Sequence, residues 1–185
     1  ILGVDDVTAE AELLAALVTF FRSVGLTEQQ VQIRISNRRL LQSVLAAAGV
    51  GEDLFAPVCV LIDKLEKVPR ESIEEELSGL GVEASVIDRV LEVASCDSLA
   101  SASKLAGEGD NGLSEITRLL ELADGYGVAE WLSFDGSLVR GLAYYTGIVF
   151  EAKAITGELH RAICGGGRYD RLLSTFGGKD LPACG

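Results

Sequence analysis

Two short stretches of the sequence combine residue types that could bind a ligand. The first, residues 138–147, contains Arg140 beside a glycine, then the paired tyrosines Tyr144 and Tyr145, and it leads into an apolar run. The planar guanidinium of Arg140 can fork onto a carboxylate or a phosphate. Consecutive side chains of a strand point to opposite faces, so one tyrosine can pack while the other presents its hydroxyl. A surface arginine with two packing tyrosines would produce the same pattern.

The second stretch, residues 164–170, contains a glycine triplet followed by Arg168, Tyr169 and Asp170. Because glycine has no Cβ, this backbone can lie against a ligand or adopt a positive φ. The stretch differs from a phosphate-binding P-loop, since no Gly-Lys-Ser/Thr follows the glycines. Glycine triplets are also common in ordinary loops, but the position between a predicted strand and a predicted helix favours the wall of a ligand site.

The remaining reactive side chains indicate no further site. His160 is the single histidine and has no histidine or cysteine partner nearby in the sequence, so an ordinary structural residue is expected and no metal site is predicted. No C-x-x-C pair occurs, and free thiols, buried or half-buried in a reducing compartment, are expected. The four cysteines are Cys59, Cys96, Cys164 and Cys184.

The elements expected to position the two stretches begin with a helix, a strand and a second helix. Thr8 is expected to cap the first helix, which ends at Gly25. Apolar and polar residues alternate over residues 31–35, which predicts a strand with one buried face. A second helix is predicted from the Ser-Asn cap at residues 36–37 to Gly49.

A series of short amphipathic helices is predicted next, separated by glycine, proline and polar turns. They cover residues 54–65, 71–80, 84–94, 98–105 and 113–126. The pattern then changes to strands, of which the last two form an antiparallel hairpin, and to a short final helix. These strands cover residues 128–134, 146–154 and 159–164, and the helix covers residues 171–176.

The predicted fold class is α+β, with a core split by an insertion. Residues 1–49 and 127–185 form the two parts of an antiparallel-sheet core, and residues 50–126 form an all-helical module. The chain has 185 residues, of which 48% are hydrophobic, and this excludes wholesale disorder. No apolar run is long enough to span a bilayer, so no membrane association is expected.

The formal charge of −12 argues against a nucleic-acid grip that depends on the bulk charge of this chain. The first residues are acidic, so neither a signal peptide nor a transit peptide is in view. The absence of methionine and the end of the chain directly after Cys184 suggest a fragment of a longer protein. A cytoplasmic location is expected, and a chloroplast or mitochondrion stays open if a transit peptide lies upstream.

Together, the two stretches resemble the signatures of the class II histidyl-tRNA synthetases. The family pattern R-G-L-D-Y-Y-T-G, followed by an apolar strand and an acid, stands at residues 140–151. The second pattern, G-G-G-R-Y-D, stands at residues 165–170, and F-G-G and P-A-x-G follow at 176–178 and 182–185. The helical module resembles the insertion domain that members of this family carry at the same point.

The resemblance implies a homodimeric enzyme that activates L-histidine with ATP and Mg²⁺ to histidyl-adenylate and transfers it to tRNA(His). Arg140 would be the catalytic cation, contacting the histidine carboxylate and the α-phosphate of ATP. The histidine side chain would lie in a pocket that hydrogen-bonds the ring nitrogens and so rejects apolar side chains. The residues that would form this pocket are Tyr144, Tyr145, Gly165, Gly166 and Tyr169.

The sequence departs from the family pattern at Ala143, where aspartate is usual. The family's motifs 1, 2 and 3, with the dimer interface and the ATP-binding arginines, and its anticodon-binding domain have no counterpart in these 185 residues. The chain alone is therefore not expected to form histidyl-adenylate. An alternative is a synthetase-like regulatory subunit that senses histidine without aminoacylation. A plain helical interaction module would leave both signatures unexplained.

Overall fold

The computed structural model describes residues 1–65, 67–107, 109–139, 144–157 and 162–185, and in them a sheet is flanked by two groups of helices. In chain order, the N-terminal elements are α1 (Thr8–Ser23), β1 (Val31–Asn37) and α2 (Arg38–Ala48). The middle contains α3 (Glu52–Ile62), α4 (Arg70–Gly79), α5 (Ala84–Ala94), α6 (Leu99–Leu105) and α7 (Asn111–Gly125). The C-terminal elements are the 3-10 helix η1 (Ala129–Trp131), β2 (Leu132–Phe134), β3 (Ile148–Ala154), β4 (Ala162–Gly167) and α8 (Leu172–Thr175).

The sheet has four strands in the order β2-β1-β3-β4. β3 is antiparallel to both β1 and β4, as the sequence predicts, whereas β1 and β2 are parallel. A parallel pair requires a crossover connection, and here the helices from α2 to α7 lie between the two strands in the chain. The α+β class is therefore confirmed, with a mixed rather than a purely antiparallel sheet.

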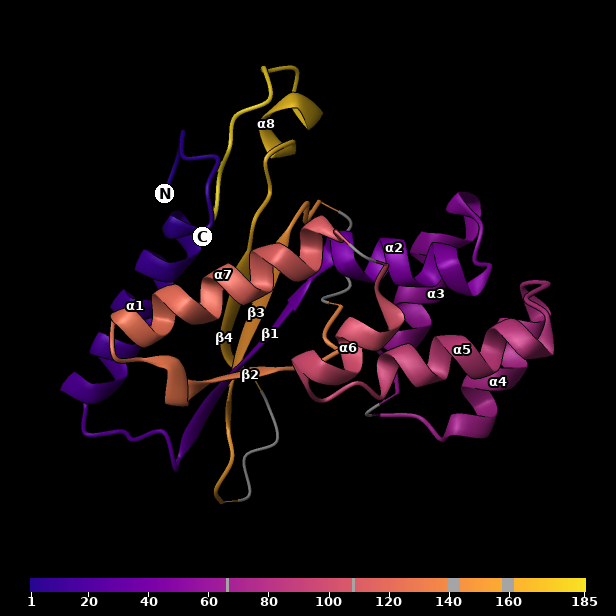
Figure 1. Ribbon diagram of the computed structural model, residues 1–185, viewed down its shortest axis with the longest axis horizontal. Helices are drawn as coiled ribbons and strands as arrows, with labels where there is room; N and C mark the ends of the chain where they lie inside the picture. Colours follow the sequence, from indigo (N-terminus) through magenta and orange to yellow (C-terminus); the bar gives the residue numbers. More distant parts are fainter. Residues whose placement is uncertain (66, 108, 140–143, 158–161) are drawn as a thin grey trace.

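Both ends of the chain extend the sheet beyond β4 (Figure 1). The backbone amide of Gly167 donates to the Gly185 carbonyl over 3.0 Å, and the amide of Gly185 donates back over 3.1 Å. Next to this segment, the amide of Cys184 donates to the Ile1 carbonyl over 3.0 Å. The first and last residues thus lie side by side, next to the strand that carries the glycine triplet.

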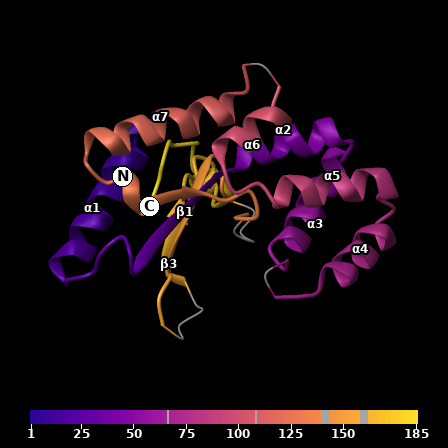
Figure 2. The same ribbon diagram turned by 60° about the horizontal axis from the view of Figure 1, so that its bottom comes forward.

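One face of the sheet is apolar and the other is charged, because side chains alternate along each strand. Ile33 and Ile35 of β1 and Phe150 of β3 are buried on the apolar face. Figures 1 and 2 show α7 crossing this part of the sheet, with α1 beside it and packed against α7. Arg34 and its cross-strand partner Glu151 lie on the opposite face.

The helices α3 to α6 form a group beside the sheet, joined to it through α2 (Figure 2). The cap signals of α2 are confirmed: the Asn37 side chain accepts from the Arg39 amide, and Gly49 adopts a left-handed conformation with φ of 104°. The last helix, α7, packs against α1, α2 and β1. α2 and α7 therefore connect the helical group to the sheet at both of its ends.

Three local predictions need correction. Thr8 is the first residue of α1 rather than its cap, and the Asp6 carboxylate accepts from its backbone amide over 2.9 Å. Residues 129–131, expected in a strand, form the 3-10 helix η1, and β2 begins only at Leu132. β4 runs through the glycine triplet to Gly167 instead of ending at Cys164, while residues 159–161 of the expected strand lie outside the described residues.

No single helix in the described ranges is long and apolar enough to cross a membrane. α2 and α3 together pass on length and composition only, and they meet at a bend of 114°.

Candidate functional site

The two signature stretches converge on the charged face of the sheet. Tyr145 packs with Leu138 and Val149, and Tyr169 packs against this cluster. Val149 lies two residues before Glu151 on β3, so the cluster shares a face with the charged residues. We call Leu138, Tyr145, Val149 and Tyr169 the tyrosine cluster. It brings together residues that are well separated in the sequence, as a ligand pocket requires.

The three tyrosines differ in exposure. Tyr145 is 6% exposed, whereas Tyr144 is 38% exposed, and their ring centroids lie 4.7 Å apart. Tyr144 also meets Tyr169 edge to face, with centroids 6.2 Å apart, a geometry that aromatic rings prefer. Three aromatic rings therefore form one continuous patch. Arg140, the predicted catalytic cation, lies outside the described residues, as does Ala143.

The glycine triplet allows close backbone packing within the sheet. A Cβ on Gly166 would lie 2.0 Å from the Gly185 carbonyl oxygen. A Cβ on Gly167 would lie 2.6 Å from the Ile148 carbonyl and 2.9 Å from the Tyr145 ring. Gly165 is exposed and pairs with Glu151 in the register of β3 and β4. At Gly166 and Gly167, glycine is thus required by neighbouring protein atoms.

Arg168 forms the most buried ion pair of the site, which the sequence reading missed. Its side chain is 5% exposed, and it donates to both carboxylate oxygens of Glu10 on α1, over 2.5 and 2.7 Å. It also donates to Asp170 over 3.1 Å. Burial lowers the pKa of Arg168, but the hydrogen bonds and charges of Glu10 and Asp170 outweigh it and raise the pKa above its ordinary value. The arginine therefore stays charged and fixes β4 to α1.

The position of Glu10 in the sequence suggested only an acidic residue in the first turn of a helix. In the structure it is fully buried. Its register gives one signal that could have identified it, because Glu10 lies four residues before Leu14 on the buried face of α1. A charged residue on an apolar helix face needs a buried partner.

Asp170 occupies the centre of the hydrogen bonds around the tyrosine cluster. Its carboxylate accepts from the Thr146 hydroxyl over 3.0 Å and from the Ala183 amide over 3.1 Å. Its own amide donates to the Thr146 hydroxyl over 3.1 Å. Because Thr146 follows Tyr145 and Asp170 follows Tyr169, these bonds connect the backbone next to both tyrosines.

A cleft of about 500 Å³ opens beside the tyrosine cluster, between the start of α2 and the segment around α8. Tyr144, Tyr145, Thr146 and Asp170 contribute to its wall from the two signatures. The other lining residues are Arg38, Arg39, Gln42, Phe55, Arg171, Thr175 and Asp180. Arg38 lies over the Phe55 ring, with its guanidinium carbon 5.0 Å from the centroid.

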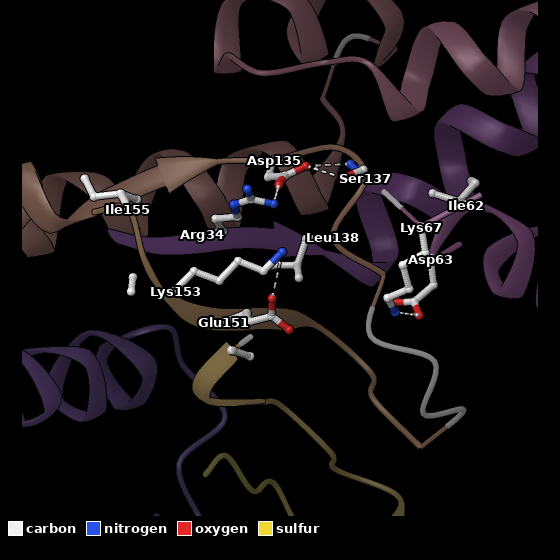
Figure 3. Close-up of a pocket in the computed structure, with 12 residues that line it drawn as sticks. Arg34, Ile62, Asp63, Lys67, Asp135, Ser137, Leu138, Glu151, Lys153 and Ile155 are labelled. Atoms are coloured by element: carbon white, nitrogen blue, oxygen red, sulfur yellow. Dashed lines mark hydrogen bonds and ion pairs between the residues drawn. The ribbon is translucent and has the colours of Figure 1, made fainter. Parts of the chain in front are cut away.

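A larger groove, of about 720 Å³, lies on the other side of Leu138 and is shown in Figure 3. Arg34 donates to Asp135 over 3.0 Å, and Lys153 lies 3.4 Å from Glu151. A third ion pair, between Asp63 and Lys67, enters the groove from the end of α3. Each of these cations faces an acid, so an anion bound here would compete with carboxylates.

Within the described ranges, no group of three or more His, Cys, Asp or Glu side chains could hold a metal ion. None of these side chains is therefore assigned to Mg²⁺. The charged groove and the cleft meet at the tyrosine cluster, which we take as the candidate site.

Comparison with known proteins identifies the family. A family model described as histidyl-tRNA synthetase matches residues 1–185. The chain belongs to the histidyl-tRNA synthetase family. It is 50% identical to the chloroplastic/mitochondrial histidine–tRNA ligase of Arabidopsis thaliana over its whole length, and it covers 38% of that relative. The class II resemblance of the two signatures is thereby confirmed at the level of the family.

Solved structures of the family share the fold. The histidyl-tRNA synthetase of Nostoc superposes with a TM-score of 0.85 at 26% identity, over 98% of this chain and 44% of that one. A Bacillus halodurans protein described as an ATP phosphoribosyltransferase regulatory subunit/histidyl-tRNA synthetase superposes with a TM-score of 0.83. It is 24% identical, over all of this chain and 48% of that one, and therefore supports the fold alone.

Proposed function

We propose that the protein is a histidine–tRNA ligase and that this chain supplies the histidine-pocket half of its catalytic core. The observation that carries the proposal is the convergence of Tyr145 and Tyr169, one from each signature, in a single cluster. The match to the family over the whole chain supports it. The reaction would join histidine to ATP as histidyl-adenylate and then transfer the histidyl group to tRNA(His).

The roles of the site residues follow from this proposal. Tyr145 and Tyr169 would place their hydroxyls around the imidazole ring, and Tyr144 would line the same pocket. Gly165 would keep the sheet surface open to the substrate amino acid, whereas Gly166, whose Cβ position is filled by Gly185 and Phe150, would contribute by allowing the close packing of β4. Arg140 would neutralise the charge that develops as the histidine carboxylate attacks the α-phosphate.

ATP and Mg²⁺ would enter as substrate and activator. The ATP-binding arginines of motifs 2 and 3 have no counterpart in these 185 residues, so the chain alone is not expected to activate histidine. We also propose the homodimer that is usual in the family.

The two ends of the chain pair with each other beyond β4, and we propose that further strands of the core adjoin this edge of the sheet.

We propose that the catalytic core comprises residues 1–49, α7 and residues 127–185, and that the helical insertion, predicted over residues 50–126, ends before α7. α7 packs against α1, α2 and β1, which favours placing the second boundary before α7 rather than after it. The compact insertion would then consist of α3 to α6.

For the compartment, we keep the cytoplasm and an organelle as the two candidates. The 50% identity to the chloroplastic/mitochondrial ligase of Arabidopsis thaliana favours an organelle. A fluorescent fusion of the whole protein would decide between the two by microscopy.

The decisive test of the proposed activity is histidine-dependent exchange of pyrophosphate into ATP by the whole protein. We expect exchange, and a loss of roughly 100-fold or more in the rate with Arg140→Ala, as is typical for removal of one preorganised transition-state donor. Arg70→Ala, which removes an exposed arginine whose ion pair is with Glu74 on the same helix, is the matched control and should leave the rate unchanged. A loss of less than about threefold in Arg140→Ala would contradict the role of Arg140.

A synthetase-like regulatory subunit that senses histidine is the second candidate, because a shared fold alone does not separate it from a ligase. Such a protein would bind histidine but would neither exchange pyrophosphate nor charge tRNA(His). Calorimetric binding of histidine, measured beside the exchange assay, distinguishes the two candidates.

A further inference from the structure

A chain of alternating charges passes through Asp170, which follows Tyr169, and links helices that are far apart in the sequence. Its members, in spatial order, are Glu115 of α7, Arg39 of α2, Asp170, Arg168 and Glu10 of α1. Arg39 lies 2.5 Å from Glu115 and 3.8 Å from Asp170, and Arg168 lies 3.1 Å from Asp170. Each inner member therefore faces opposite charges on both sides.

Arg39 also contacts the first signature directly. Its Nε donates to the Thr146 carbonyl over 3.1 Å. Thr146 exchanges hydrogen bonds with Asp170 in both directions, through its hydroxyl. Arg39 thus contacts, on one side, the two residues that directly follow Tyr145 and Tyr169. Both residues are themselves only partly buried, so Arg39 supports them at the rim of the cleft.

On its other side, Arg39 is fixed to the place where the helical insertion is attached. The Asn37 side chain, 1% exposed, donates to the Gly112 carbonyl over 3.2 Å and to Glu115 over 2.6 Å. A Cβ on Gly112 would lie 2.3 Å from the backbone nitrogen of Leu40, so α2 and α7 approach each other closely here. The start of α2 and the start of α7 are therefore clamped together, and Glu115 holds Arg39 in this clamp.

We propose that Arg39 is a positioning residue for the histidine pocket. It would hold Thr146 and Asp170, and so the tyrosines that precede them, in a fixed position relative to the starts of α2 and α7. This inference rests on the proposed histidine site. In the described ranges, the side chain of Arg39 bonds to Thr146, Asp170 and Glu115, none of which is assigned to the substrate. It would affect how well the ring is bound, equally in the ground state and the transition state, and such a residue changes KM with little effect on kcat.

The test uses Arg39→Ala in the whole protein, because the Arg39 side chain is 44% exposed and its removal leaves the apolar core intact. We expect the Kd of histidine, by calorimetry, and its KM in pyrophosphate exchange to rise about three- to tenfold, the range typical of loss of one ordinary hydrogen bond at a partly exposed site. The kcat and the KM of ATP should change by less than about twofold. Arg39→Lys keeps the charge but loses the Nε donor to Thr146, so it should restore the affinity only in part.

Arg118→Ala is the matched control, because Arg118 is an exposed arginine of α7 whose ion pair is with Glu121 on the same helix. It should leave both constants unchanged. Unchanged histidine affinity in Arg39→Ala, or equal changes for histidine and ATP, would overturn the positioning role. If the protein binds histidine without exchanging pyrophosphate, the ligase proposal fails while the Kd still tests Arg39. If it binds no histidine, both proposals fail.

Discussion

The Arg168–Glu10 pair shows how a signature residue can act through structure. Arg168 precedes Tyr169, and its guanidinium donates to Glu10 on α1 and to the carbonyls of Val4 and Asp6. All three guanidinium nitrogens of Arg168 donate hydrogen bonds, to carboxylates or to backbone carbonyls, and these bonds offset the cost of burying the charge. The arginine thereby fixes the end of β4, directly before Tyr169.

We expect Glu10→Gln to lower the free energy of unfolding of the 185-residue chain by roughly 3 kcal/mol, because it removes the fully buried counter-charge of Arg168 and leaves the guanidinium with the less buried Asp170. Urea titration followed by circular dichroism measures this change. Glu74→Gln breaks an exposed pair with Arg70 and should cost less than about 0.5 kcal/mol. Equal, small effects of both variants would contradict a stabilising role for the buried pair.

The cysteines should differ in reactivity according to burial. Burial raises the pKa of the Cys59 thiol to about 11, and it also raises the pKa values of Cys96 and Cys184. At about pH 8 these three thiols stay protonated, and a protonated thiol is a poor nucleophile. In the folded chain, iodoacetamide should therefore modify the half-buried Cys164 first, as followed by mass spectrometry. In urea, all four should react at similar rates; preferential labelling of Cys59 in the folded chain would refute this order.

At the scale of the elements, β4 depends on the absence of side chains at its glycines. We expect Gly166→Ala to destabilise the chain by about 1–3 kcal/mol. The new Cβ would overlap the Gly185 carbonyl and force the C-terminal segment away from β4. Thermal unfolding by circular dichroism measures the effect. Gly125→Ala is the control, since a Cβ at the end of α7 meets no atom within 4 Å. A Gly166→Ala chain as stable as this control would show that the edge pairing contributes little.

The elements differ in how far the sequence predicts them. α2 is delimited by local signals, the Asn37 cap and the left-handed Gly49, and both act within a few residues. The end of β4 has no such local signal. Its last residue, Gly167, pairs with Gly185, and this contact exists only in the folded sheet. In the same way, Arg168 and Glu10 are 158 residues apart, so no local pattern joins them. The two tyrosines of the site were predictable from their signatures, whereas the residues that support them are set by tertiary contacts.

At the scale of the whole molecule, the acidic excess does not prevent a local basic contact. The lining of the cleft beside the tyrosine cluster contains Arg38, Arg39 and Arg171 with Asp170 and Asp180, so it carries one more positive than negative charge in a chain whose formal charge is −12. A partner such as RNA would meet this local arrangement rather than the mean charge, because surface fields are screened over about 10 Å at ordinary salt.

The apolar core is continuous from the sheet into the helical group. One cluster of buried residues includes Trp131 beside α1, Leu45 of α2 and Ile73 of α4. Because α2 packs on α5 as well as on α7, the two halves share a helix instead of a flexible linker. A core of this kind favours cooperative unfolding of both halves.

We therefore expect a single unfolding transition in urea. Trp131, the only tryptophan in the sequence, stacks on Phe21 of α1 with ring centroids 6.0 Å apart, so its fluorescence reports on the sheet side. Circular dichroism at 222 nm reports on all the helices together. In a two-state transition the two probes give the same curve. The midpoints of the two signals should coincide. Leu45→Ala, which removes a fully buried side chain of the shared helix α2, should lower both midpoints together by creating a cavity. If ellipticity instead fell at lower urea than fluorescence, the helical group would unfold independently, and the shared core would not couple it to the sheet and its tyrosine cluster.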